Sequence, residues 1–151
     1  MSTITTTLNT GQQAIFDTDL QKIFLWGNRY GKFAYAKTNS TYDDFTLPAG
    51  TLMGRKHADG YVIPLASGAS DGSQYPVGIL AADVVVLAGE SFDGEIQLCV
   101  AGDVNEDLVL LDGSDTLDTV ISARTIRDRV AADTVGIILK TVDELTKADN
   151  S

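Results

Sequence analysis

The sequence has little of the chemistry on which enzymes and metal sites depend, with one cysteine and one histidine among 151 residues. A single cysteine, Cys99, cannot form an intramolecular disulfide, so we expect no dependence on an oxidising compartment. Its strand-like surroundings lack basic neighbours, which indicates a buried hydrophobic side chain rather than a reactive thiol. The lone histidine, His57, lies in a predicted hairpin and has no second histidine with which to build a metal cluster. We therefore expect no enzyme activity, no cofactor and no bound metal.

Adjacent carboxylates are the remaining candidates for acid-base chemistry. Asp43 precedes Asp44, and Glu106 precedes Asp107. Adjacent residues of a strand point to opposite faces, so neither pair aims easily at one substrate atom. The stretch 103–107 resembles a calcium loop, but it lacks the glycine and the distal glutamate of that motif. We interpret it as a solvated turn.

Lysine and arginine are missing from the middle of the chain. Residues 61–121 carry none of them against eleven Asp and Glu, whereas residues 1–60 carry six against five and residues 122–151 five against five. The whole net charge of −10 therefore comes from the middle segment. Such a surface repels phosphates, which excludes nucleic acid as a partner of this segment. We expect much of the segment to face solvent.

Long hydrophobic runs are also missing. The longest apolar stretches, such as 84–88, are far too short to cross a bilayer. The first twenty residues lack the basic segment and apolar core of an export signal. We expect a cytoplasmic product with no membrane partner, of a length that suits one domain.

The N-terminal part is polar at first and then rich in aromatic residues. Residues 1–10 are a threonine-rich run with Ile4 and Leu8 as isolated apolar residues, and we predict an extended arm that a partner orders. Residues 14–36 hold several aromatic side chains and the only tryptophan, Trp26, in a weakly periodic pattern. This pattern predicts either a strand pair on the main core or an adhesive segment that packs against another chain.

From residue 45 onward, short strands and turn signals follow one another at nearly regular spacing. Residues 51–56 and 61–65 flank an Asp-Gly pair, which is a strong hairpin signal. A loop over 67–74 follows. The further predicted strands are 77–80, 95–101, 108–111 and 135–139.

One helix is predicted after Ser122, which we expect to be its N-cap. Ala123, Ile126 and Val130 then form one apolar stripe. The fold class is therefore mixed α/β and mostly β: a compact small-barrel-like β core, one main helix near the C-terminus and an extended N-terminal arm. We divide the chain into an arm and aromatic-rich segment (1–44), a body (45–142) and a polar tail (143–151).

Three stretches, taken in order, point to a known family. The first is LPAGTLMGR at 47–55, the second is ASDGSQ at 69–74 leading to VGIL at 77–80, and the third is the predicted helix followed by 135–139. Together they resemble the lambda-type head decoration (capsid cement) proteins of tailed bacteriophages over about residues 45–140. The middle stretch is the most specific. The motif residues to which the resemblance assigns a structural role are Pro48, Gly50, Gly54, Ser70, Asp71, Gly72 and Gly78.

The resemblance implies a structural protein of the virion. Members of this family are small mixed α/β subunits that form trimers on the outer face of the expanded capsid. It implies that the body forms a homotrimer and that the N-terminal part meets the major capsid protein of the same phage. An arm that is ordered only on binding can add a strand to an exposed sheet edge of that partner, which suits recognition of mature shells alone.

The resemblance does not cover residues 15–35, so the capsid contact within them is a hypothesis of its own. It is motivated by Phe16, Phe24 and Trp26, which lie in one segment outside the matched body. The residues that we assign to this contact are Ile4, Leu8, Ile15, Phe16, Ile23, Phe24, Leu25 and Trp26. The alternative is a small β-rich ligand-binding module, for example one that binds carbohydrate, for which we expect a monomer with an exposed aromatic platform.

Overall fold

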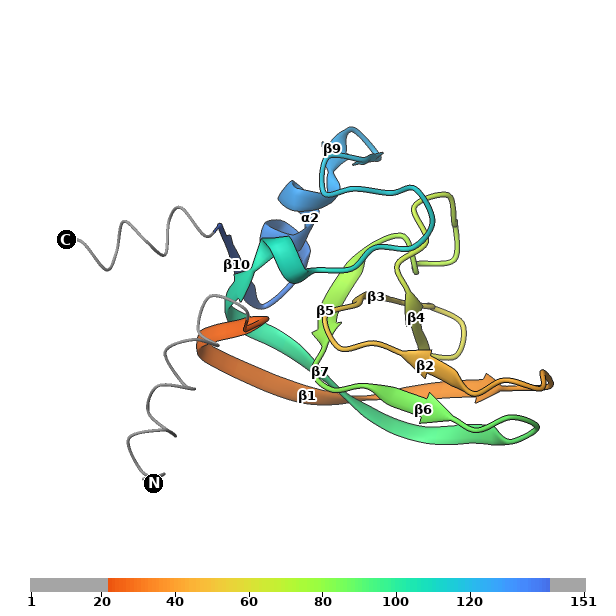
Figure 1. Cartoon of the computed structure of the whole chain (residues 1–151). Coiled ribbons are helices and arrows are strands. Elements are labelled where there is room, and N and C mark those ends of the chain that lie inside the picture. The colour runs from red at the N-terminus through yellow and green to blue at the C-terminus, as the bar shows by residue number, and fades with distance from the viewer. Residues whose placement is uncertain (1–21, 142–151) are drawn as a thin grey trace, which may run out of the picture.

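Residues 22–141, which the computed structural model describes, fold into a twisted, mostly antiparallel sheet with one α-helix (Figure 1). In chain order the elements are β1 (Phe24–Thr38), β2 (Phe45–Leu47), β3 (Leu52–Arg55), β4 (Val62–Pro64), β5 (Pro76–Leu80), β6 (Val84–Val86), β7 (Ser91–Asn105), a 3₁₀ helix (Glu106–Leu108), β8 (Val120–Ile121), β9 (Arg124–Thr125), α2 (Ile126–Asp133) and β10 (Gly136–Lys140).

The main sheet has the strand order β1-β7-β5-β3-β4, and β10 pairs with β7 beyond the end of β5. Strands β1 and β7 are each 15 residues long and pair antiparallel from Phe24 opposite Val104 to Thr38 opposite Ser91. This two-stranded ribbon runs the length of the molecule (Figure 1). At its far end, β2 and β6 form a separate small sheet beside it. We call this end, with β2 and β6, the wing.

The strands do not close into a barrel, so the expectation of a barrel-like core is wrong in that respect, although the fold is mostly β as predicted. Within residues 22–141, β4 pairs with β3 alone and no ladder joins it to β1. Strand β4 has three residues, and Pro64 has no N–H to donate. Side chains instead bridge the open seam between the β3–β4 hairpin and the ribbon of β1 and β7. The Arg55 guanidinium lies 5.9 Å from the centre of the Phe33 ring. The Tyr61 hydroxyl donates to Asp93 Oδ1 at 3.1 Å.

Two apolar clusters lie on opposite faces of the sheet, one on each face. At the end of the molecule that carries α2, which we call the body from here on, α2 places Ile126 and Val130 against Leu52, Ile79 and Cys99. In the wing, the cluster has buried Tyr35, Leu47, Met53, Val62, Leu80, Ile96 and Leu98. Strand β7 contributes to both clusters, because a strand alternates its side chains between faces. The structure thus joins the body and the wing through one continuous sheet.

The aromatic-rich segment is part of this sheet from Phe24 onward. Strand β1 pairs with β7 along its length, and Tyr35 is buried in the wing cluster. Of the two interpretations of this segment, the strand pair on the main core is therefore the one observed over Phe24–Thr38. The division at residue 44 separated β1 from the sheet to which it belongs.

The helix is shorter than predicted, and the expected N-cap is wrong. Ser122 and Ala123 have φ values of 50° and 70°, and they form the turn between β8 and β9. The helix begins at Ile126, and the hydroxyl oxygen of Thr125 accepts from the N–H of Asp128 at 3.2 Å. Serine and threonine are both good caps, so local pattern alone did not distinguish the two positions.

The strand predicted over 108–111 is also absent from the structure. Residues 106–108 form a 3₁₀ helix, for which the Asn105 side chain caps the N–H of Asp107 at 3.1 Å. Leu110 makes only an isolated parallel bridge to Thr51. The other predicted strands correspond to β3, β4, β5, β7 and β10.

Candidate interaction face

The residues assigned to capsid contact are separated by the fold. Ile23 and Phe24 are half-buried and pack against the body cluster, and Leu25 is half-buried as well. Trp26 is 80% exposed. The other assigned residues, Ile4, Leu8, Ile15 and Phe16, lie outside the described residues.

Irregular pairing turns Trp26 outward. The register of β1 against β7 shifts between Phe24 and Trp26 and again between Trp26 and Arg29. Extra residues in one strand of a pair re-aim side chains and increase the local twist. Gly27, with a φ of 65°, follows directly. These irregularities also explain the weak periodicity of this stretch in the sequence.

Trp26 shares a face of the sheet with β10. Asp103 of β7 pairs with Trp26 on one side and with Ile138 on the other. Paired residues of neighbouring strands point to the same face, so these three side chains form one surface, together with Lys140, whose Nζ lies 3.9 Å from Asp103 Oδ2. Ile138 is more than half exposed. We call this surface, made of Trp26, Asp103, Ile138 and Lys140, the Trp26 face.

The outer edge of β10 adjoins the Trp26 face. Within the described part of the chain, β10 pairs with β7 only. A groove of about 270 Å³ lies between β10 and α2, lined by Arg127, Asp128, Ala131, Ile137, Ile138 and Leu139. An open strand edge beside an apolar groove can accept an extended segment of another chain.

Arg127 at this groove is held by carboxylates. Its guanidinium donates a hydrogen bond to Glu106 and lies 3.7 Å from Asp118. The hydrogen bond to Glu106 is the main cause that raises the pKa of Arg127 above its ordinary value. Glu106 is therefore occupied in tying the 3₁₀ helix to α2. The second carboxylate pair also has a structural contact, because Asp44 Oδ1 accepts from the N–H of Ala88 at 2.9 Å.

The motif glycines lie where the backbone is crowded. A Cβ on Gly54 would fall 2.0 Å from the carbonyl oxygen of Ser73, and one on Gly78 would fall 2.8 Å from that of Cys99. A Cβ on Gly50 would fall 2.7 Å from a backbone oxygen, and one on Gly72 would fall 2.5 Å from the His57 ring. Each motif position therefore has a packing reason for glycine.

The remaining motif residues build turns. The carbonyl of Pro48 accepts from the N–H and the hydroxyl of Thr51 at 3.3 and 2.7 Å. Asp71 Oδ1 accepts from the hydroxyl and the N–H of Ser73 at 2.5 and 3.0 Å, and the side-chain bond is the main cause that lowers the pKa of Asp71 below its ordinary value. Ser70 is exposed in the same loop.

One stretch has the sequence pattern of a catalytic motif but not its structure. Gly68-Ala69-Ser70-Asp71-Gly72 has the spacing of a nucleophile elbow. That motif requires a sharp turn from a strand into a helix. In this fold the pentapeptide lies in turns and bends between β4 and β5, and α2 comes more than fifty residues later. Ser70 is exposed but lacks the strand-to-helix turn on which this motif depends.

Within residues 22–141, no three His, Cys, Asp or Glu residues come together as metal ligands. No helix in that part of the chain has the length and apolar character to cross a membrane.

The eleven carboxylates between residues 61 and 121 include none that is buried in the single chain. Of the exposed apolar residues on the Trp26 face, the sequence pointed to Trp26, while Ile138 was hidden inside a predicted strand whose exposed face was not recognised.

Neither a scan against models of known protein families nor a search of curated proteins gives a match for this chain. The resemblance to decoration proteins therefore depends on the three sequence stretches themselves.

Proposed function

We propose that the chain is a head decoration (cement) protein of a tailed bacteriophage and acts without bond-making chemistry of its own. It binds the outer surface of the expanded capsid as a homotrimer, contacts the major capsid protein and stabilises the shell against internal DNA pressure. Its location is the virion surface, after synthesis in the bacterial cytoplasm. The observation that carries the proposal is the ordered set of three stretches, whose glycines at 50, 54, 72 and 78 coincide with close backbone approaches.

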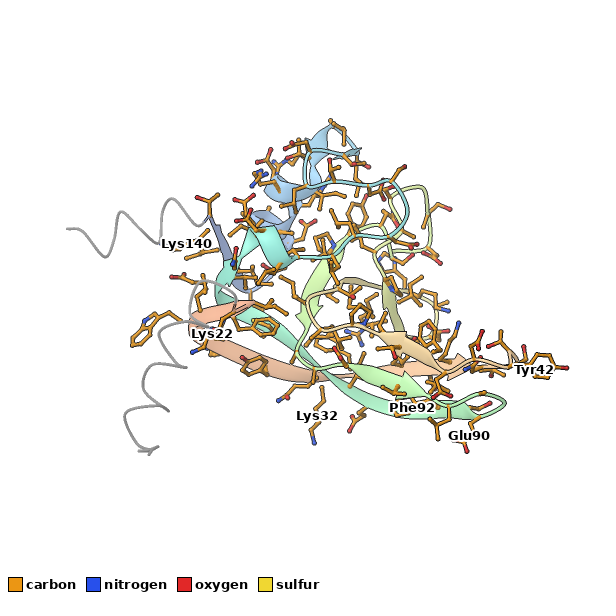
Figure 2. All side chains as sticks on the ribbon, in the orientation of Figure 1. Lys22, Lys32, Tyr42, Glu90, Phe92 and Lys140 are labelled. Atoms are coloured by element: carbon orange, nitrogen blue, oxygen red, sulfur yellow. The ribbon has the colours of Figure 1, made fainter. Side chains whose placement is uncertain are left out.

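The Trp26 face supports a capsid contact in this proposal. A large aromatic side chain that is 80% exposed gains much from burial in a partner. The face lies at the end of the molecule where Lys22 and Lys140 are found (Figure 2). The N-terminal residues 1–21 join the chain at this end, so an arm and Trp26 can engage the same partner. Three copies in one trimer would raise the effective concentration of each further contact.

The acidic middle segment suits an orientation away from the shell. Its carboxylates are exposed or half-buried, and burying them unpaired against another protein would be costly. We therefore propose that most of them face solvent on the decorated particle.

The test is attachment to undecorated heads, both expanded and unexpanded, followed by imaging. Three proteins should be compared with the unaltered chain: a deletion of residues 1–21, Trp26→Ala, and Val120→Ala as a control at another exposed apolar residue. The deletion stops at residue 21 because Ile23 and Phe24 pack against the core. We expect the unaltered chain to bind expanded heads only.

We expect the deletion and Trp26→Ala each to weaken attachment on the order of tenfold or more, and Val120→Ala to leave it unchanged. Trp26→Ala should change the free energy of unfolding by less than about 0.5 kcal/mol. Failure of the unaltered chain to bind either kind of head would refute the proposal. Binding of a glycan that depends on Trp26 would favour a carbohydrate-binding module instead.

A further inference from the structure

A second exposed aromatic residue lies at the opposite end of the molecule from the Trp26 face. Tyr42 is fully exposed in the loop between β1 and β2, and Figure 2 shows it at the far end of the wing from Lys22 and Lys140. Leu87, which is about half exposed, follows β6 next to this loop. We call residues 39–44 and 87–90 the wing tip.

The wing tip is held in one conformation before any partner binds. Asn39 is 3% exposed, and its side-chain amide donates to the carbonyls of Asp43 and Val86, each at 2.9 Å. Its Oδ1 accepts from the N–H and the hydroxyl of Thr41 at 3.2 and 2.7 Å. The N–H of Asn39 donates to the carbonyl of Glu90 at 2.8 Å. Because the loop is already ordered, presenting Tyr42 to a partner costs little conformational entropy.

The charge around the wing tip selects a basic partner. Residues 37–47 and 83–95 contain six Asp and Glu against one Lys, Lys37, whose Nζ lies over the Phe45 ring. Asp43 and Glu90 are exposed at the tip itself. A tyrosine ring also attracts a cation placed over its face. The complementary surface is therefore one with arginine or lysine beside an apolar or aromatic group.

The same chain carries such a surface on β1. Arg29 and Lys32 are exposed, and neither makes an ion pair within the described residues. Tyr30 between them is partly exposed and stacks edge-on against Phe24 at 5.8 Å between ring centres. Lys32 projects from the ribbon on the side away from the body (Figure 2).

These two surfaces cannot meet within one molecule. Arg29 and Thr38 belong to the same strand, and nine residues of strand span about 30 Å. Strand β1 is paired with β7 throughout this length, so it cannot fold back. The complementarity is therefore available only between two copies.

We infer that the wing tip of one copy binds a second copy at Arg29, Tyr30 and Lys32 of β1. Tyr42 lies against Tyr30 and the Arg29 guanidinium, while Asp43 and Glu90 face Arg29 and Lys32. Each copy binds one neighbour through its wing tip and is bound at β1 by the wing tip of another. Such a head-to-tail contact forms a closed ring when the rotation between neighbouring copies permits. The inference rests on the proposed function, because it names the surface through which the proposed trimer forms.

Charge reversal on each side tests this contact. The tip variant carries Asp43→Lys and Glu90→Lys, the strand variant carries Arg29→Glu and Lys32→Glu, and a third protein carries all four changes. Asp107→Lys with Asp112→Lys is the matched control, since both are exposed carboxylates outside the wing. Tyr42→Ala removes the anchor and leaves the hydrogen bonds of Asn39 in place. Sedimentation velocity over a concentration series measures the association constant, and circular dichroism checks that each variant is folded.

We expect the tip variant, the strand variant and Tyr42→Ala each to weaken self-association on the order of tenfold. The protein with all four changes should regain most of it, and the control should retain it. The inference would be overturned if the trimer formed equally well in these variants, or if the protein with all four changes did not regain self-association. It would also be overturned if the unaltered chain stayed monomeric at every concentration. Attachment of the unaltered chain to expanded heads is measured alongside, and a positive result there preserves the proposed function even if this contact fails.

Discussion

The side-chain amide of Asn39 donates a hydrogen bond to the carbonyl of Val86, which lies 47 residues further along the chain. This bond and the one to Asp43 satisfy polar groups at a buried position. It joins the loop after β1 to the end of β6, so one side chain holds two segments of the wing tip together.

We expect Asn39→Ala to lower the free energy of unfolding by about 2–3 kcal/mol, because it leaves buried hydrogen-bonding groups without partners. Urea denaturation measures this loss. Amide hydrogen exchange should also become faster in residues 41–44. Ser40→Ala, at the exposed neighbour, is the control and should have little effect. A loss below about 0.5 kcal/mol would contradict the role assigned to Asn39.

We expect Gly54→Ala to destabilise the protein by about 3 kcal/mol or more, because the new Cβ would collide with the backbone at Ser73. Gly68→Ala is its control, since a Cβ there meets nothing within 4 Å, and it should be neutral or slightly stabilising. Thermal unfolding of both variants makes the comparison. Equal melting temperatures would show that β3 can move away from Ser73 without cost.

We expect Ile126→Ala to lower the free energy of unfolding by about 2–5 kcal/mol, because Ile126 is fully buried between α2 and the sheet and its loss leaves a cavity. Ile138→Ala makes the same chemical change at an exposed position and should lower it by less than about 1 kcal/mol. Guanidinium denaturation distinguishes the two. A similar loss in both would mean that Ile138 contributes to the core of the single chain.

We expect the stabilising effect of Asp71 to depend on pH. Because the hydroxyl and N–H of Ser73 lower the pKa of Asp71 in the folded state, its ionised form is favoured by folding. The stabilisation is present above the ordinary carboxyl pKa of about 3.9 and is lost as the pH falls toward the lower folded pKa. Asp71→Asn should therefore melt below the unaltered protein at pH 7, with the difference shrinking below about pH 4.

Asp112→Asn is the control for this experiment, since it makes the same change at another exposed carboxylate. The melting-temperature difference between this variant and the unaltered protein should be small at pH 7. If the difference for Asp71→Asn instead grows on acidification, ionised Asp71 does not stabilise the folded state.

The parts of the fold that sequence reasoning captured are those encoded by neighbouring residues. The Asp-Gly hairpin became β3 and β4, and the apolar runs near residues 77 and 137 became β5 and β10. These elements have their turn residues and their apolar residues within a few positions of one another. Ile126 and Val130 form the buried stripe of α2 for the same reason.

The parts that were missed depend on distant partners. Strand β1 continues past Gly27 and Gly31 because β7 pairs with it about seventy residues later, and a local pattern does not contain that partner. The open seam between β4 and β1 likewise follows from strand lengths that only the assembled sheet determines. Ser122 and Ala123 have positive φ angles that the turn between β8 and β9 imposes, so the helix starts three residues later than its apolar stripe suggested.

The candidate interaction face was predictable in part. A lone tryptophan in an aromatic segment drew attention to Trp26, but its neighbours Ile23 and Phe24 were assigned to the same contact and instead pack inward. The exposure of Ile138 and Tyr42 follows from pairing and loop geometry. The amino-acid composition alone does not predict the exposure of either residue.

The ribbon of β1 and β7 has a mechanical consequence. Tension that enters at the loop after Thr38 passes along β1 and is transferred to β7 by rungs that run from Thr38 opposite Ser91 back to Phe24 opposite Val104. Those rungs are loaded in shear and share the force, so none of them has to break first. A subunit bound at both ends would therefore resist extension along the ribbon.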